Sequence, residues 1–243
     1  MDRTPPGAAV RAQGFGVKGP RGWAFEEVDV DAPPGSLIAV EGPSGSGRTC
    51  LLLALTGRMR PGAGSAEIGG LALPKRMAGV RQFSALAHVP GVAELEPALT
   101  VAEHLRERVL LQRRFSGSPR ELLRPRSERR AAARARIDAA LAAAGLEPAT
   151  LPKDERTAAR DLERLEALRL SLALALIGAP RLIAVDDLDL KLSDAERAEA
   201  WALLRSLADA GTTVLAVCSE APGDAVTVRT GQIKKEAALN ALA

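Results

Sequence analysis

A glycine-rich loop between two apolar segments is the feature that most constrains how this chain can fold. The loop spans residues 42–49 (GPSGSGRT), follows the continuously apolar residues 37–40, and precedes the apolar residues 50–55. A short run that is apolar at every position is typical of a buried strand in a parallel sheet, whereas residues 50–55 predict a helix that ends near Gly57. A strand, a glycine loop and a helix in this order predict an α/β fold around a mostly parallel sheet.

The loop fits the phosphate-binding pattern GxxxxGK[ST], except that Arg48 occupies the lysine position. Glycines let the backbone wrap tightly, so successive N–H groups converge on a phosphate at the positive end of the following helix. The hydroxyl of Thr49 would bind Mg²⁺, and Arg48 would reach the β and γ phosphates. Because a guanidinium is planar and larger than an ammonium, we expect nucleotide binding to persist in weaker form and transition-state alignment to suffer more. The candidate nucleotide-binding residues are Gly42, Pro43, Ser44, Gly45, Ser46, Gly47, Arg48 and Thr49.

A second apolar run, residues 182–185, ends in the two acids Asp186 and Asp187. This pattern predicts a buried strand whose carboxyl end carries a carboxylate, at the edge where α/β sheets bind ligands. Asp186 is therefore a candidate ligand of Mg²⁺ together with Thr49. Asp187 stands where a general base for water could lie. The plain alternative is that the two acids only end the strand.

The rest of the chain divides into strand-like and helix-like regions. Few β-branched residues occur from about 100 to 169, where Ala, Arg, Leu and Glu dominate and predict helices. Capping boxes at residues 100–103 (TVAE) and 193–196 (SDAE) open two of the predicted helices. We expect further strands at residues 23–30, 65–68, 86–89 and 212–217, a loose segment up to about residue 14, and a small hairpin at 225–233.

Composition excludes several classes of function. The 243 residues are 47% apolar and 26% charged, with a net charge of +3, so the chain should fold without a general attraction to nucleic acid. Only 2% of residues are aromatic and none is Tyr, which disfavours a stacking platform for single strands. The longest apolar stretch, residues 170–177, is far shorter than a membrane span, and the first residues lack the apolar core of a secretory signal. We expect a cytoplasmic protein with reduced thiols at Cys50 and Cys218, and any membrane span must come from another chain.

The ordered set of motifs resembles the ATP-binding cassette (ABC) ATPases, the nucleotide-binding subunits of ABC transporters. Residues 42–57 resemble the family's Walker A loop and first helix, and residues 179–186 resemble the segment that leads into its Walker B strand. Residues 89–105 resemble the family's VPQ…LTVxENL stretch. Residues 201–217 resemble the helix and strand that precede its switch histidine.

The resemblance has several implications. It implies a P-loop NTPase core with a small antiparallel β region, forming one domain over residues 1–243 with a helical lobe inserted at about 92–165. It also implies ATP and Mg²⁺ as ligands, a homo- or heterodimer with another cassette, and a separate transmembrane permease that holds the chain at the inner face of the cell membrane. In the family the inserted lobe meets the permease. The arginine-rich residues 106–136 are either a solvated helical face or part of such a contact.

Several positions depart from the family pattern. The glutamine of the family's Q-loop falls on Gly91, the LSGGQ signature falls on residues 162–166 (LERLE), and the switch histidine falls on Ser219. The catalytic glutamate falls on Asp187, which keeps the acid but is one methylene shorter. The aromatic residue that stacks on the nucleotide is either Phe15 or Trp23.

Three functions follow from the matches and departures together. The first is an ATP-binding subunit of a transporter with slow or absent hydrolysis, since the residues at several catalytic positions cannot perform the family's roles. The second is a non-catalytic nucleotide sensor or scaffold, or a degenerate partner of an active cassette. The third is another P-loop enzyme, such as a kinase acting on a small molecule.

Overall fold

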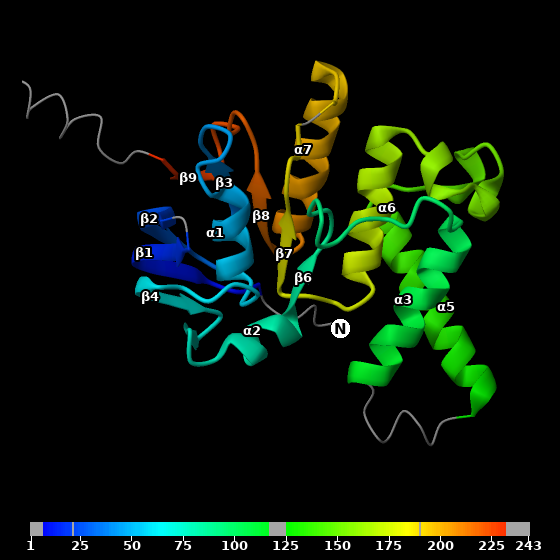
Figure 1. The fold of residues 1–243 in the computed structure, drawn as a ribbon. Coiled ribbons are helices and arrows are strands. Elements are labelled where there is room, and N and C mark those ends of the chain that lie inside the picture. Colours follow the sequence, from blue (N-terminus) through cyan, green and yellow to red (C-terminus); the bar gives the residue numbers. More distant parts are fainter. Residues whose placement is uncertain (1–6, 21, 117–124, 190, 232–243) are drawn as a thin grey trace, which may run out of the picture.

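A five-stranded parallel sheet forms the centre of the molecule in this computed structural model, which describes residues 7–20, 22–116, 125–189 and 191–231 (Figure 1). Its strand order is β6-β7-β8-β3-β9, and every neighbouring pair is parallel. The strands are β3 (Leu37–Glu41), β6 (Ser84–Leu86), β7 (Leu182–Val185), β8 (Thr213–Val217) and β9 (Val226–Arg229). The three continuously apolar runs of the sequence are therefore adjacent central strands, which confirms the predicted α/β fold.

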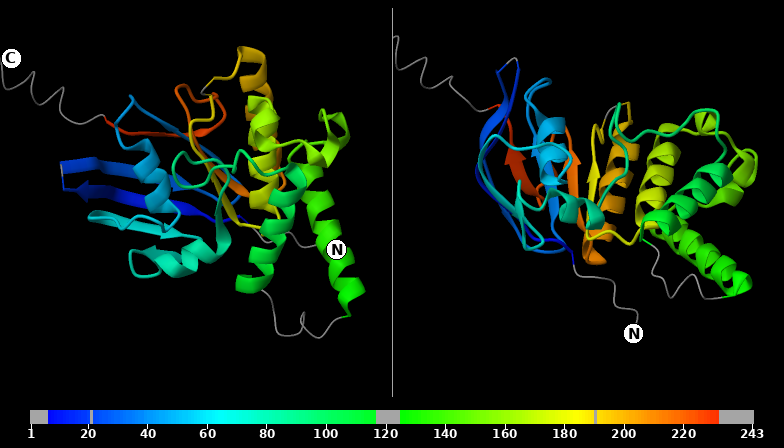
Figure 2. Two further views of the ribbon diagram at one scale, coloured as in Figure 1. Left: turned by 45° about the vertical axis from the view of Figure 1, so that its right-hand side comes forward. Right: turned by 60° about the horizontal axis from the view of Figure 1, so that its bottom comes forward.

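A second, antiparallel sheet of order β2-β1-β4-β5 lies beside the central one. Its strands are β1 (Val10–Gly19), β2 (Gly22–Ala32), β4 (Ala63–Ile68) and β5 (Leu71–Leu73). Helix α1 (Arg48–Leu55) packs between the two sheets, with contacts to β1, β2 and β8. The layers are seen edge-on in the right panel of Figure 2.

Alternate residues of the central strands supply two separate cores. In β3, Ile38 and Val40 face α1 and the antiparallel sheet, whereas Leu37 and Ala39 face the helices on the other side. This alternation follows from the two-residue period of a strand. A sheet covered on both faces needs apolar residues at every position, which explains the continuous runs.

The remaining helices lie on the far side of the sheet or apart from it (Figures 1 and 2). Helix α7 (Asp194–Asp209) covers β3 and β8, and α6 (Arg164–Leu176) packs against α3 (Val101–Ser116) and α5 (Arg126–Ala143). The predicted capping boxes are present: Glu103 accepts from the Thr100 backbone N–H at 2.8 Å, and Glu196 accepts likewise from Ser193. Helices α3, α5 and α6 pack together to one side of the sheet, and we call them the helical lobe below.

Two predictions about the ends of the chain are wrong. Residues 10–14, expected to be loose, belong to β1, where Val10 pairs with Ala32 on one side and Ile68 on the other. The many small residues and the irregular register of this strand hid its alternation from the sequence pattern. The expected hairpin at 225–233 is instead the single strand β9, parallel to β3 at the edge of the central sheet, and residues 232–233 lie outside the described residues.

A third prediction is displaced by two residues. The strand expected at 86–89 is β6, at Ser84–Leu86, and Val89 begins a tight turn. Here Val92 N–H donates to the Val89 carbonyl at 3.0 Å around Pro90 and Gly91, and Gly91 has φ 71°. Proline followed by a residue of positive φ is the signature of a type II turn, which explains why glycine stands at 91.

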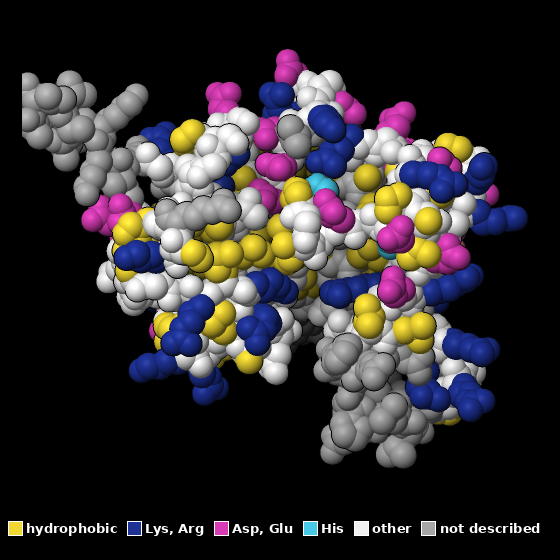
Figure 3. Space-filling model, in the orientation of Figure 1, with side chains coloured by type: hydrophobic (Ala, Val, Ile, Leu, Met, Phe, Trp, Pro, Cys, Tyr) yellow, Lys and Arg dark blue, Asp and Glu magenta, His cyan; other side chains and the backbone are white. Residues whose placement is uncertain are grey.

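A groove of about 780 Å³ separates α2 (Met77–Phe83) from α3. Its lining includes the arginines Arg58, Arg81 and Arg108. Figure 3 shows Lys and Arg side chains gathered over α2 and beside this hollow. Among the described residues, no helix is both long enough and apolar enough to cross a membrane.

Candidate nucleotide-binding site

Three loops that follow three adjacent strands meet at the carboxyl edge of the central sheet. The glycine loop follows β3, Asp186 follows β7, and Cys218 follows β8, which lies between the other two strands. Because parallel strands end at the same edge, residues far apart in the sequence are brought together here. The structure thus places both predicted motifs at one site.

The glycine loop is held tightly against β2. Gly47 has φ 85°, and a Cβ atom at this position would lie 2.1 Å from the Ala24 carbonyl oxygen. Only glycine fits such a contact at positive φ, so the chain enters α1 in one conformation. On the other side, the Ser46 hydroxyl lies 2.6 Å from the Thr230 hydroxyl. The loop is therefore fixed by its neighbours, as a rigid phosphate cradle requires.

Thr49 and Asp186 form the contact between the two motifs. The Thr49 hydroxyl donates to Asp186 Oδ2 at 2.6 Å, and Asp186 Oδ1 accepts from the Asp187 N–H at 2.9 Å. Asp186 is buried, and burial raises the pKa of its carboxyl, with the charge of Asp187 adding to the effect. A buried carboxylate with a hydroxyl beside it is a pair of oxygen ligands suited to Mg²⁺.

The chemistry of this donor set fits a metal shared with a nucleotide. No group of three or more His, Cys, Asp or Glu side chains that could hold a metal occurs within residues 7–20, 22–116, 125–189 and 191–231. Mg²⁺ keeps several waters and is held by one or two protein oxygens plus phosphate oxygens in nucleotide sites. Thr49 and Asp186 would supply the protein oxygens, and bound Mg²⁺ would neutralise charge between phosphates.

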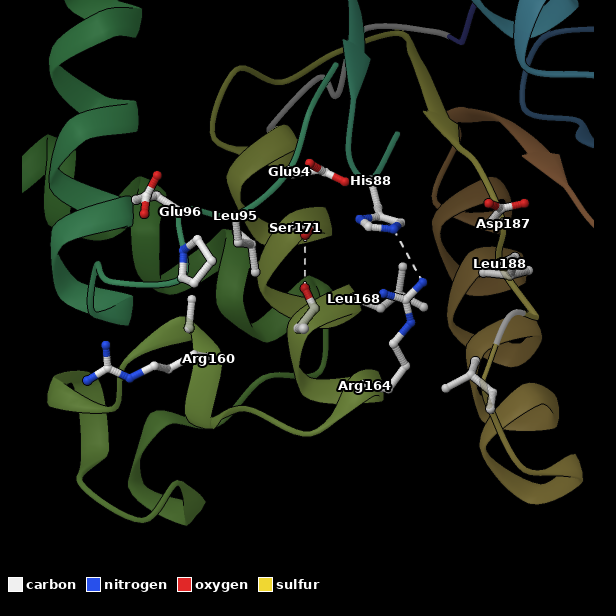
Figure 4. Close-up of a pocket in the computed structure, with 14 residues that line it drawn as sticks. His88, Glu94, Leu95, Glu96, Arg160, Arg164, Leu168, Ser171, Asp187 and Leu188 are labelled. Atoms are coloured by element: carbon white, nitrogen blue, oxygen red, sulfur yellow. Dashed lines mark hydrogen bonds between the residues drawn. The ribbon is translucent and has the colours of Figure 1, made fainter. Parts of the chain in front are cut away.

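Asp187 lies at the mouth of a cavity of about 500 Å³ between the sheet edge and the helical lobe (Figure 4). Its backbone has φ 47°, and its carboxylate makes no hydrogen bond with the described residues. The same cavity is lined by His88, Glu94 and Arg164. The predicted general base therefore lines a cavity that charged side chains share with apolar ones.

His88 and Arg164 join the core to the helical lobe across this cavity, as the dashed line in Figure 4 shows. Arg164 Nη2 lies 3.2 Å from His88 Nε2. Arginine has no acceptor, so His88 Nε2 must accept and the neutral ring carries its proton on Nδ1. Burial and the charge of Arg164 lower the pKa of His88, which favours this neutral form. No local sequence pattern predicts this contact, since its partners are 76 residues apart.

The position of the family's signature is occupied by a helix cap. Glu163 is the N-cap of α6, its side chain accepts from the N–H of Glu166, and Glu166 Oε2 accepts from the Glu163 N–H at 2.9 Å. Two carboxylates thus satisfy the helix start from within the chain. The spacing of Glu163 and Glu166 is that of a capping box, but Glu is not one of the favoured N-cap residues, so the pattern alone does not predict this cap.

The other departures are placed as follows. Gly91 forms the turn described above and offers no side chain. Ser219 is exposed directly after Cys218, and its N–H donates to Asp189 Oδ2 at 2.7 Å. Arg48 does not point freely into the loop, because its Nη1 donates to the Cys218 carbonyl oxygen at 2.9 Å.

Of the two candidate stacking aromatics, the structure leaves one accessible. Phe15 is fully buried, with its ring centroid 6.0 Å from that of Phe25. Trp23 is 42% exposed, and the Lys18 ammonium lies 5.5 Å from its ring centroid. Only Trp23 therefore remains a candidate for contact with a nucleotide base.

Comparison with known proteins agrees with this geometry. The family model described as "ABC transporter" matches residues 25–188. The chain is 29% identical over 192 residues to the Nod factor export ATP-binding protein I of Cupriavidus metallidurans, covering 78% of this chain and 56% of that protein. It is 42% identical over 64 residues to the hemin import ATP-binding protein HmuV of Gloeobacter violaceus, covering 26% of this chain and 23% of that protein. The chain thus matches at most about half the length of these two relatives.

Among solved structures, the chain resembles the dimeric, post-hydrolysis ATP-binding cassette MJ0796 bound to ADP and Pi. The TM-score is 0.65 at 22% identity, over 87% of this chain and 88% of that one. This likeness shows the P-loop NTPase fold of a cassette. Taken with the family match over residues 25–188, it leads to one conclusion. The chain belongs to the ATP-binding cassette family of ABC transporters.

Proposed function

We propose that this chain is an ATP-binding subunit of an ABC-type transport system. It binds Mg-ATP through residues 42–49 and Asp186, and it couples nucleotide-dependent dimerisation to a separate membrane subunit. Its own hydrolysis is weak or absent. The single observation that carries the proposal is the 2.6 Å hydrogen bond from Thr49 to Asp186, which joins the glycine loop to the acidic strand end. The relatives named above belong to an export and an import system, so the proposal names no transported compound.

Weak hydrolysis follows from the residues at three positions of the family pattern. Gly91 lacks a side chain, Ser219 lacks an imidazole, and Glu163 presents a carboxylate where the family presents a small polar residue. Electrostatic stabilisation and general-base action each contribute factors of about 10² or more in rate, so the loss of several leaves little turnover. These same features support the second candidate, a nucleotide sensor or the degenerate partner of an active cassette.

The groove between α2 and α3 supports a protein partner. Arg58, Arg81 and Arg108 bond only to backbone carbonyls and the Ser84 hydroxyl in the part of the chain that the structure describes. Burial and the charges of the other two lower the pKa of Arg58 to about 10. The exposed side chains of Val92 and Leu111 also line the groove.

A cationic floor with an apolar rim is complementary to an amphipathic segment that carries Asp or Glu. We place the membrane subunit at this groove and hence the chain at the inner face of the membrane. The proposed unit is one cassette over residues 1–243 with the helical lobe at about 92–165, and no nucleic acid is involved.

Calorimetry tests the proposal directly. The purified chain should bind ATP in the presence of Mg²⁺ and should bind it at least ten-fold more weakly in EDTA, because Thr49 and Asp186 then hold no metal. Absence of binding at millimolar Mg-ATP would refute the proposal.

Steady-state ATPase assays separate the two candidates. The double variant Arg48→Lys with Asp187→Glu restores the family's residues at the loop and the base. Turnover by the double variant should stay within about ten-fold of the wild type, because Gly91 and Ser219 remain. Robust turnover by the wild-type chain alone would instead exclude the sensor.

A further inference from the structure

Arg48 reaches out of the glycine loop to a single peptide group at the end of β8. Its Nη1 donates to the Cys218 carbonyl oxygen at 2.9 Å. Cys218 is fully buried, and its own N–H donates to the Val40 carbonyl at 3.1 Å. The acceptor of Arg48 is therefore anchored on the sheet.

The same peptide group is held from its other side. The carbonyl of Cys218 and the N–H of Ser219 belong to one planar unit. That N–H donates to Asp189 Oδ2 at 2.7 Å, and Asp189 lies in the loop that follows Asp186. The Arg48 guanidinium donates to the oxygen of this peptide, and the Asp189 carboxylate accepts from its N–H. These two charge-assisted hydrogen bonds fix the plane of the peptide, so the orientation of Ser219 depends on Arg48 and Asp189.

Arginine suits this arrangement in a way that lysine does not. A guanidinium carries five N–H donors on a rigid plane, and Arg48 uses one nitrogen for the Cys218 carbonyl. The remaining donors diverge from that contact, so the group can hold the carbonyl and a phosphate oxygen at once. An ammonium is a compact point charge on a flexible stem and provides no fixed span between two acceptors.

We propose that Arg48 is a positioning residue that couples phosphate binding at residues 42–49 to the Cys218–Ser219 peptide. A bound triphosphate fixes the guanidinium, the guanidinium fixes the peptide, and Ser219 is held toward the nucleotide edge of the sheet. Arg48 and Ser219 then act together, and their departures from the family's lysine and histidine are not independent of each other. This inference rests on the proposed function, because it requires a nucleotide in the loop.

Amide hydrogen exchange of Ser219 measures the coupling. Saturating Mg-ATP should slow exchange of the Ser219 N–H at least ten-fold in the wild-type chain. In the nucleotide-free chain, Arg48→Lys should speed this exchange at least ten-fold, and Mg-ATP at a concentration that saturates the variant should no longer slow it. Arg58→Lys is the matched control, since Arg58 is also partly buried and donates to backbone carbonyls, but away from the loop. It should leave Ser219 exchange within two-fold of the wild type.

A second variant tests the other side of the peptide. Asp189→Asn should also speed Ser219 exchange in the nucleotide-free chain while leaving Mg-ATP affinity within about two-fold. Two results would overturn the coupling: Ser219 exchange that is unchanged in Arg48→Lys, or exchange that Mg-ATP still slows in this variant. If calorimetry on the same samples shows Mg-ATP binding, these results overturn the coupling and leave the proposed function standing. A chain that binds no Mg-ATP would overturn the proposed function and the coupling together.

Discussion

The carboxyl edge of the central sheet and the start of α6 have diverged from the cassette pattern to different degrees. At the sheet edge, Gly47, Thr49 and Asp186 keep the residue types and contacts that a phosphate and Mg²⁺ require. At the start of α6, Glu163 and Glu166 fill the signature position and cap the helix themselves. The family resemblance implies that, in a dimer, the first region would hold the nucleotide and the second would approach it from the partner cassette.

The difference separates two physical requirements. Binding a nucleotide depends on backbone geometry and one hydroxyl–carboxylate pair within this chain. Closing a dimer around the nucleotide also depends on a helix start that tolerates negative charge nearby. Two carboxylates at that start oppose a polyphosphate, so nucleotide binding can be kept while closure of the dimer is weakened. The predictions below test this separation, beginning with the change of largest effect.

Gly47→Ala should disrupt the glycine loop at the carboxyl edge of the central sheet. The new Cβ would lie 2.1 Å from the Ala24 carbonyl oxygen, so backbone must move. We expect a loss of about 3 kcal/mol of unfolding free energy and no measurable Mg-ATP binding. Denaturant titration and calorimetry measure the two effects.

Gly45→Ala is the matched control for the same loop. Gly45 has φ 79°, but its Cβ would meet nothing within 4 Å. Backbone strain alone should cost about 1 kcal/mol. Equal losses in the two variants would show that the close contact with Ala24 is unimportant.

Asp186→Asn should affect binding and stability in opposite directions. Removing the buried charge relieves its desolvation, so the free energy of unfolding should stay equal or rise, while Mg-ATP affinity should fall about 100-fold. The wild type should show the matching pH dependence. Because burial raises the pKa of Asp186, the carboxylate protonates at a higher pH than an ordinary aspartate, and Mg-ATP affinity falls there on acidification. An unchanged affinity in Asp186→Asn would remove this residue from the metal site.

Glu163→Ser should strengthen closure of the dimer without harming the fold. Serine is a good N-cap, so unfolding free energy should change by less than about 0.5 kcal/mol, whereas Glu163→Ala should cost about 1 kcal/mol. With one carboxylate removed, Mg-ATP-dependent self-association in sedimentation velocity should strengthen at least ten-fold. If Glu163→Ser dimerises no better than the wild type, charge at the start of α6 is not what limits closure.

The sequence predicted the central sheet and the site better than the periphery, for a physical reason. Strands covered on both faces are apolar at every position, and the glycine loop requires particular residues at particular spacings, so both leave strong local patterns. The strand at residues 10–14 is hard to predict because its buried positions are only Val10 and Ala12, and Ala carries little hydrophobic signal. The sequence predicts a hairpin in place of the edge strand β9 because pairing with β3 depends on a residue 188 positions away.

The contacts that set the orientation of site residues were not predictable for a related reason. Arg48 bonds to a backbone carbonyl, and any residue type supplies a carbonyl, so nothing in the sequence marks Cys218 as its acceptor. Glu163 and Glu166 have the spacing of a capping box, but Glu is not a favoured N-cap residue, so the sequence does not predict that this pair caps α6. Side-chain identity predicts local chemistry, whereas long-range partners depend on topology.

His88→Gln should produce the smallest effect, at the contact between the core and the helical lobe. Burial and Arg164 lower the pKa of His88 in the folded chain, so the unfolded chain binds a proton first as pH falls below about 6.5. The neutral His88 ring therefore contributes its full share of the unfolding free energy above that pH. This share is lost as the pH falls toward the lower pKa that His88 has in the folded chain. Glutamine can still accept from Arg164 but does not titrate, so the difference in unfolding free energy between pH 7.5 and 5.5 should shrink by up to about 1 kcal/mol.

The charged neighbours of His88 provide the control for that measurement. Besides Arg164, the carboxylates of Glu94, Asp186 and Asp187 act on the ring and oppose the lowering of its pKa. Glu94→Gln should therefore lower the pKa of His88 further and steepen the acid loss of stability, the opposite of His88→Gln. Denaturant titrations of the three proteins across this pH range measure the slopes. If His88→Gln leaves the profile unchanged, His88 is not the titrating group, and acid sensitivity then belongs to the sheet edge rather than to the contact with the lobe.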